Sequence, residues 1–199
     1  GTHNVLSSGR KIVKPYFDFF NYSGIQRSVY LVMLPAESIQ DYEVRYTLNG
    51  ADAQVDYKVF CEGAEEISVQ LLDAENKLVA EANGVEGALC VQNAHLWQVR
   101  NAYLYTIVIT LKKDGLPVDE YRERIGIRTV EIRGTKILIN GKPVYLKGFG
   151  KHEDFDILGR GFNWAVAKRD FECMKWTDAN CFRTSHYPYA EEWYQMADE

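Results

Sequence analysis

The chain has 199 residues, 46% of them hydrophobic and 13% aromatic, so it is long enough to bury the core of one or two domains. Its net charge is −5 and charges of both signs are interspersed, which gives no indication of binding to nucleic acid or to an anionic membrane surface. No apolar run approaches the ~20 residues that a transmembrane helix requires.

The cysteines show no C-x-x-C pairing, which argues against a zinc site and against a dense disulfide framework. They are Cys61, Cys90, Cys173 and Cys181. Free thiols fit a reducing compartment, so a cytoplasmic location is expected. Neither a metal nor a cofactor is expected. The chain begins Gly1-Thr2-His3 and its first methionine is Met33, so the natural N-terminus is expected to be missing.

The first 36 residues contain one notable carboxylate. Residues 1–15 are polar and turn-rich, and a loose lead-in is expected there. Asp18 follows among aromatic residues, where a buried carboxylate is costly unless it is hydrogen-bonded. It either caps backbone amides in a turn or holds a polar ligand. The run Ser28–Leu34 predicts a strand that Pro35 ends.

Residues 37–128 have an all-β pattern. Apolar and polar residues alternate in short segments, and Asn49-Gly50 is a strong turn signal. This spacing predicts an immunoglobulin-like β-sandwich that acts as a structural spacer. His95-Leu96-Trp97 is either a binding patch or a tryptophan packed at one end of the sandwich. The expected strands are 42–48, 55–60, 67–72, 78–82, 88–91, 103–111 and 121–127.

The pattern changes from about residue 129. A hairpin around Gly134 and a turn at Asn140-Gly141 are followed by strand, loop, helix, strand and helix. Such alternation predicts a parallel α/β architecture. A (β/α)8 barrel needs eight units and about 250 residues, so residues 129–199 predict only its first two units, an incomplete barrel. The expected elements are strand 144–150, loop 155–163, helix 167–179, a strand from 180 and a helix that starts at Pro188.

Polar side chains follow both of these parallel strands. His152 comes after the first, and Arg183 and His186 lie at the end of the second. Neighbouring strand ends share one opening in a barrel, so the three are expected to converge. Metal binding is one alternative, but no H-x-x-x-H spacing supports it. A ligand rich in hydroxyl groups fits the mixture of donors and acceptors better, while Glu153 and Asp154 could instead cap the loop that follows.

Several of these stretches resemble the bacterial β-glucuronidases of glycoside hydrolase family 2, over about Tyr16 to Glu199. The resemblance implies the end of a jelly-roll sugar-binding domain in residues 1–36, an immunoglobulin-like domain in 37–128 and the start of the catalytic barrel in 129–199. The similar stretches are Asp18-Phe-Phe-Asn-Tyr-Ser-Gly-Ile, Gly126-Ile-Arg, Leu138-Ile-Asn-Gly-Lys-Pro, Gly148-Phe-Gly-Lys-His-Glu-Asp and Asn180-Cys-Phe-Arg-Thr-Ser-His-Tyr-Pro-Tyr-Ala-Glu-Glu.

The resemblance also implies roles for individual residues. Asp18 would accept hydrogen bonds from hydroxyl groups of the glycone, and His152 and His186 would line the sugar site. Arg183 would lie beside the nucleophilic carboxylate and hold it ionised. Phe17 stands where members of the family often have histidine, which leaves the contacts on that side undefined.

The expected function is that of a fragment of a retaining hydrolase that cleaves β-D-glucuronides to glucuronate and an alcohol. Such enzymes use two glutamates about 5 Å apart, and neither Glu153 nor Glu191 matches them. Both are expected beyond Glu199, so the chain has no catalytic residue and should be inert alone. The alternatives are a β-galactosidase or other family 2 fragment, and a non-catalytic carbohydrate-binding sandwich. Homo-oligomers are expected because incomplete barrel faces would be exposed.

Overall fold

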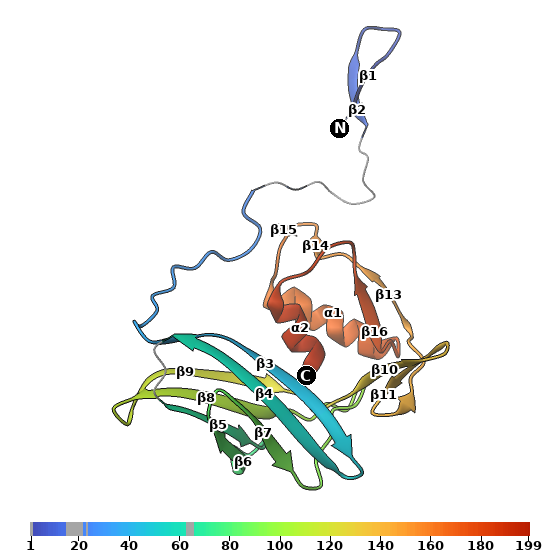
Figure 1. Ribbon diagram of the computed structural model, residues 1–199. Helices are drawn as coiled ribbons and strands as arrows, with labels where there is room; N and C mark the ends of the chain where they lie inside the picture. The colour runs from blue at the N-terminus through green and yellow to red at the C-terminus, as the bar shows by residue number, and fades with distance from the viewer. Residues whose placement is uncertain (1, 15–21, 23, 63–65) are drawn as a thin grey trace. The chain divides into compact units, whose positions relative to one another are not determined.

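The computed structural model describes residues 2–14, 22, 24–62 and 66–199 (Figure 1). Contacts between residues divide the chain into two compact units. Unit 1 comprises residues 1–29 and 147–194, and unit 2 comprises residues 30–146 and 195–199.

Unit 2 contains a sandwich of two antiparallel sheets, with strand orders β3-β4-β7 and β6-β5-β8-β9. The mainly β architecture predicted for this region is confirmed, and each of the seven expected strands overlaps an observed one. The strands are β3 (Ser38–Asn49), β4 (Asp52–Glu62), β5 (Glu66–Leu72), β6 (Leu78–Asn83), β7 (Glu86–Val91), β8 (Tyr105–Lys113) and β9 (Leu116–Ile125).

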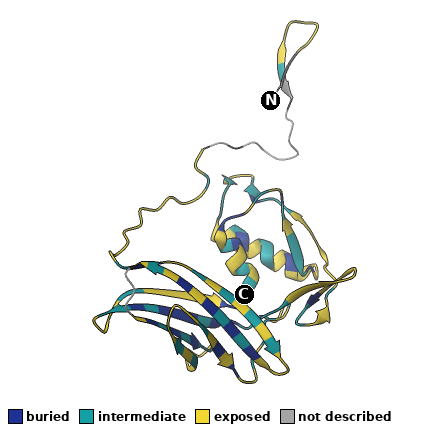
Figure 2. Ribbon diagram, in the orientation of Figure 1, coloured by how far each residue is buried: buried dark blue, intermediate teal, exposed yellow. Residues whose placement is uncertain are grey.

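The core of unit 2 lies between these two sheets. Alternate residues of a strand point to opposite faces, so each strand contributes every second side chain to the core. The buried residues of β4 and β5 follow this rule, whereas in β8 Val108 is buried in addition to its alternating neighbours Ile107 and Ile109 (Figure 2). Val55, Val69 and Leu71 have no exposed surface, and burying each stabilises the fold by about 1.5–3 kcal/mol.

A three-stranded meander follows the sandwich in unit 2. It consists of β10 (Val130–Arg133), β11 (Lys136–Ile139) and β12 (Lys142–Pro143). Asn140 and Gly141 join β11 to β12 with φ angles of 51° and 70°. Positive φ at both central residues is the signature of a type I′ turn, and asparagine followed by glycine favours it. The predicted hairpin and turn are confirmed.

Unit 1 contains a parallel pair of strands, β13 (Gly148–Lys151) and β16 (Cys181–Thr184). Helix α1 (Trp164–Trp176) connects them, and helix α2 (Glu191–Asp198) follows β16. A Cβ atom on Gly148 would lie 1.8 Å from the carbonyl oxygen of Cys181, so only glycine permits this close approach of the strands. The expected start of a parallel α/β barrel is therefore confirmed as a fold.

Both helices begin at residues other than those expected. Helix α1 begins at Trp164 because the side chain of Asn163 accepts hydrogen bonds from the amides of Ala165 and Val166 as an N-cap. Helix α2 begins three residues after Pro188, at Glu191. No helix in the described part of the chain combines the length and the apolar character needed to span a bilayer.

Two expectations for the first 36 residues are wrong. The lead-in contains a hairpin, β1 (Thr2–Val5) and β2 (Lys11–Lys14), whose turn is closed by a hydrogen bond from the Gly9 amide to the Leu6 carbonyl. Residues 28–34 form no strand, and Leu31 is 95% exposed. An apolar run becomes a strand only when it has a partner, and no described segment pairs with this one.

The loop expected over residues 155–163 also differs. Its first part forms a short hairpin of β14 (Asp154–Phe155) and β15 (Gly159–Arg160) in unit 1. Two residue pairs are too few to produce a recognisable periodicity, so sequence patterns could not predict this hairpin.

Truncating a core side chain should destabilise unit 2. Replacing the fully buried Leu71 with alanine removes apolar contacts and leaves a cavity, so the free energy of unfolding should fall by ~2–5 kcal/mol. Urea titration followed by circular dichroism would measure the change. Leu116→Ala is the control, because Leu116 is 68% exposed and its truncation should change the free energy by less than ~0.5 kcal/mol. Equal effects at the two positions would contradict the assigned core.

Candidate functional site

The candidate site lies at the carboxyl ends of β13 and β16 in unit 1. Lys151 and Thr184 are paired as the last residues of the two strands. The amide of Ser185 donates to the carbonyl of Lys151 at 2.9 Å, which extends the pairing by one residue. His152 and His186 follow directly, so two neighbouring strands each deliver a histidine to the same edge of the pair.

Three of the four site residues named from the sequence come together at this edge. The imidazole rings of His152 and His186 meet edge to face with 5.4 Å between their centroids. Nη1 of Arg183 lies 2.9 Å from Nδ1 of His186. Because a guanidinium only donates, Nδ1 must accept, which places the ring proton of His186 on Nε2. Arg183 and His186 are exposed and His152 is half-buried, so this cluster faces the surface of unit 1.

Tyr189 fixes the backbone beneath the histidines. Its buried hydroxyl donates to the carbonyl of Lys151 and also contacts Ser185, whose amide donates to the phenol oxygen at 3.2 Å. The ends of both strands are thus tied to one side chain. Burial raises the pKa of the Tyr189 phenol, which keeps the group protonated and able to donate.

Lys151 forms a second, mostly buried support. Its ammonium group lies 2.9 Å from Asp170 of α1 and 3.9 Å from the centre of the Trp193 ring. It also donates to the carbonyl of His152 at 2.9 Å. The cation therefore holds the His152 backbone against α1 and α2, and the ion pair and the aromatic face compensate for its loss of water.

Glu153 is a buried carboxylate directly behind His152. Its side chain is only 2% exposed, and Arg27 lies 3.9 Å from it. Burial raises the pKa of Glu153, while Arg27, Tyr187, Arg160 and Lys151 oppose the rise. Burial also raises the pKa of Tyr187 to about 12, and the nearby Glu153 charge adds to this shift.

Asp154 lies in the same region and forms an ion pair with Arg160 at 3.6 Å. Together with Glu153, Lys151 and Asp170 this pair lines a cavity of about 230 Å³ below the strand ends. The carboxylates after His152 therefore contact cations and other buried groups. This agrees with the structural alternative considered for Glu153 and Asp154 more closely than with direct binding of a ligand.

Asp18, the fourth site residue named from the sequence, lies outside the described residues. Among the residues that the structure describes, no group of three or more His, Cys, Asp or Glu side chains is arranged to hold a metal ion. Sequence patterns did not indicate the support given by Tyr189, Tyr187 and Arg27. Local spacing links neither Tyr189 to the end of β13 nor Arg27 to Glu153.

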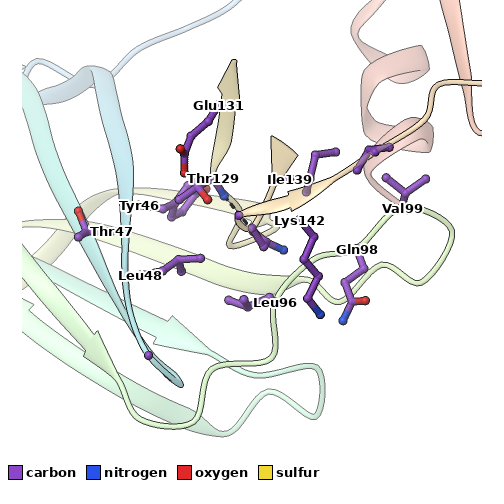
Figure 3. A pocket seen from close by; sticks show the side chains of 14 residues that line it. Tyr46, Thr47, Leu48, Leu96, Gln98, Val99, Thr129, Glu131, Ile139 and Lys142 are labelled. Carbon is purple, nitrogen blue, oxygen red and sulfur yellow. Dashed lines mark hydrogen bonds between the residues drawn. The ribbon is translucent and has the colours of Figure 1, made fainter. Parts of the chain in front are cut away.

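Unit 2 has a separate hollow of about 770 Å³, shown in Figure 3. Tyr46, Leu48 and Leu96 give it an apolar side, and Lys142 and Glu131 contribute charges. Its polar groups are partly engaged in structure, because the Asn140 side chain accepts from the Thr129 amide and donates to the Trp97 carbonyl. No set of titratable groups comparable with the strand-end cluster is found among its lining residues.

Trp97 is packed against other residues of unit 2. The Arg128 guanidinium stacks on its ring at 4.7 Å, and its indole nitrogen donates to the Asp198 carbonyl at 2.7 Å. Arg128 also forms an ion pair with Asp198 at 2.8 Å. These contacts favour the packed-tryptophan alternative for His95-Leu96-Trp97.

Comparison with known families identifies two regions. Residues 37–128 match the family Glycosyl hydrolases family 2, and residues 130–199 match Glycosyl hydrolases family 2, TIM barrel domain. The two matches lie in the same chain order as the observed sandwich and parallel strand pair.

Individual relatives are also similar over almost the whole chain. The beta-glucuronidase of Paenibacillus borealis is 45% identical over 192 residues, and that of Homo sapiens is 44% identical over 200 residues. Both alignments cover 96% of this chain. A solved structure of β-glucuronidase from Ruminococcus gnavus in complex with D-glucuronic acid is 66% identical over 100% of this chain, with a TM-score of 0.90. The chain spans only about a third of the length of these relatives, 32%, 31% and 35% respectively.

The buried charge of Glu153 should make stability depend on pH. Burial raises its pKa in the folded state above the unfolded value of ~4.3, so its contribution to stability is present below that value and is lost as pH rises through the folded pKa. Glu153→Gln carries no such charge. The unfolding free energy of the wild type minus that of Glu153→Gln should therefore decrease as pH rises, then become constant.

Denaturant titrations between about pH 4 and pH 8 would measure this difference, across the range in which a raised carboxyl pKa titrates. Glu131→Gln is the matched control, because the Glu131 side chain is 45% exposed and pairs with the exposed Arg133. A difference that is independent of pH, or that increases with pH, would contradict the assigned environment of Glu153.

Proposed function

Because the chain belongs to glycosyl hydrolase family 2, we propose that it is one part of a retaining β-glucuronidase and supplies one side of the sugar pocket. The whole protein would cleave β-D-glucuronides to glucuronate and an alcohol. The convergence of Arg183, His152 and His186 at two neighbouring strand ends carries this proposal. Similarity to a Ruminococcus gnavus β-glucuronidase in complex with D-glucuronic acid supports the choice of sugar.

Each residue of the cluster has a proposed role. The exposed guanidinium of Arg183 lies beside the nucleophilic carboxylate of the whole enzyme and keeps it ionised. His186 and His152 line the glycone and exchange hydrogen bonds with its hydroxyl groups. Asp18 accepts further hydrogen bonds from the glycone. All four residues act on binding and charge, and none is the nucleophile or the acid/base.

The proposed domain organisation follows from the same assignment. Residues 1–36 are the end of a jelly-roll sugar-binding domain, residues 37–128 an immunoglobulin-like domain, and residues 129–199 the start of the catalytic barrel. The family matches to residues 37–128 and 130–199 support the last two boundaries.

The 199-residue chain alone is proposed to be inactive. A retaining glycosidase needs two carboxyl groups about 5 Å apart that face the glycosidic bond. Glu153 is buried with its side chain only 2% exposed, and Glu191 lies in the first turn of α2. An assay with an aryl β-D-glucuronide should detect no hydrolysis by the pure chain, and measurable turnover would refute the assignment.

A chimeric enzyme tests the site residues directly. Residues 1–199 would replace the matching third of the Ruminococcus gnavus β-glucuronidase, and the chimera should hydrolyse aryl β-D-glucuronides. Arg183→Met should then reduce kcat on the order of 10²-fold, because the cation that keeps the nucleophilic carboxylate ionised is lost. Arg133→Met on the exposed β10 is the control and should retain activity. A folded chimera in which Arg183→Met keeps full kcat would contradict the role of Arg183.

Binding experiments separate this proposal from the other two interpretations. In the chimera, preference for an aryl β-D-galactoside would favour a β-galactosidase or another family 2 glycosidase. In the isolated chain, shifts of sandwich resonances on titration with glucuronate, without shifts at His152 and His186, would favour a carbohydrate-binding β-sandwich.

Self-association is also proposed, and it can be measured by light scattering. Leu31 and Met33 are 95% and 90% exposed in an extended apolar run, and such exposed apolar surface favours association. The scattering mass should rise above 22.9 kDa with concentration. Leu31→Lys combined with Met33→Lys should lower the association. A mass that remains at the monomer value at every concentration would contradict this proposal.

A further inference from the structure

We propose that Arg27 is a positioning residue that anchors residues 24–27 over the buried carboxylate of Glu153 and fixes the turns that carry His152 and His186. Residues 24–27 are called the strap below. The inference rests on the proposed function only where it identifies these histidines as sugar ligands. The contacts of the strap itself involve only unit 1.

The guanidinium of Arg27 reaches two turns at once. Nη2 lies 3.9 Å from Oε1 of Glu153, the residue directly after His152. The same nitrogen donates to the carbonyl of Pro188, two residues after His186. One side chain therefore links the segment after β13 to the segment after β16, at the positions next to the two histidines.

The strap backbone also fits closely against the loop after β13. A Cβ atom on Gly161 would lie 2.7 Å from the carbonyl oxygen of Gln26, so a side chain at this position would displace the strap. The Gln26 side chain is turned back and donates to the Tyr22 carbonyl at 3.0 Å. A Cβ atom on Gly159 would lie 3.4 Å from the Tyr22 ring. Tyr22, which precedes the strap, therefore lies close to β15, and Gln26 of the strap lies close to the glycine directly after β15.

Polar contacts, rather than apolar burial, hold the strap. Ile25, the one large apolar side chain in the strap, is 84% exposed and contributes little hydrophobic stabilisation. Glu153, in contrast, is almost completely buried. Removing Arg27 leaves this buried charge with only the weaker influence of Tyr187, Arg160 and Lys151, which should cost more than the loss of an ion pair between two exposed side chains. Arg27 should therefore contribute more than any other strap residue.

Geometry at the cluster depends on both turns being held together. The rings of His152 and His186 are in contact at 5.4 Å, and His186 in turn is bonded to Arg183. A change in either turn would move one ring relative to the other. Because small displacements of groups that orient a substrate reduce the rate strongly, a residue that fixes these turns would act on catalysis without touching the sugar.

The test compares Arg27→Met, Arg27→Lys and the exposed control Arg133→Met in the ¹⁵N-labelled 199-residue chain. Arg27→Met should lower the heteronuclear NOE of residues 24–27 and shift the imidazole resonances of His152 and His186. His95 packs on Tyr103 in unit 2 and serves as the internal reference. Arg27→Lys retains the charge but not the planar guanidinium, so it should restore these signals partially. Arg133→Met should change none of them.

A double-mutant cycle tests the charge pair itself. Arg27→Met should destabilise the wild type more than it destabilises Glu153→Gln, because the second background has no buried charge to compensate. Equal costs in both backgrounds, or unchanged NOE and imidazole signals in Arg27→Met, would overturn the inference.

The chimeric enzyme separates this inference from the proposed function. There, Arg27→Met should lower kcat/KM by roughly 10- to 100-fold, with partial recovery in Arg27→Lys. If the NMR changes occur while the parent chimera has no glucuronidase activity, the proposed function fails and the role of Arg27 in holding the turns stands. If the chimera is active and Arg27→Met changes neither the spectra nor kcat/KM, only the role of Arg27 fails.

Discussion

The arrangement at the candidate site depends on how β13 and β16 end. Parallel strands leave backbone groups unpaired at their carboxyl ends, and buried groups of this kind must find partners. Here the Ser185 amide donates to the Lys151 carbonyl, and the Tyr189 hydroxyl bonds at the same junction. Burial keeps this phenol protonated. With both ends satisfied at one level, His152 and His186 leave the strands side by side.

Charged and mostly buried side chains lie next to His152 at the end of β13. Lys151 and Glu153 flank His152 on either side, and their side chains are 10% and 2% exposed. Desolvation makes such charges costly, and each is compensated by a partner on another element: Asp170 on α1 for Lys151, and Arg27 for Glu153. The first pair connects the end of β13 to α1, and the second connects the residues after β13 to the segment that contains Arg27. Because desolvation offsets much of the gain from pairing, the two pairs fix the positions of these segments more than they add stability.

Local patterns predicted the parts of the fold that local interactions form. Alternation identified the sandwich strands, and asparagine followed by glycine identified the turn at 140–141, because those signals lie within a few residues. The run 28–34 has strand composition but no described partner, and pairing is decided elsewhere in the chain. In the candidate site, too, local patterns identified some residues, and others depend on contacts between distant parts of the chain. The histidines could be identified from their place after apolar runs, whereas Arg27 acts on Glu153 across 126 positions that no periodicity connects.

Two kinds of residue therefore make up the site. Arg183 and His186 are exposed, so replacing them removes few packing contacts and should leave the fold nearly as stable. Lys151, Glu153 and Tyr189 are largely buried, so replacing them alters stability and geometry together. A loss of activity without a loss of stability consequently identifies a residue that acts on the ligand. A loss of both, restored in part by a substitution that keeps the charge, identifies a residue that acts through the backbone of the two histidines.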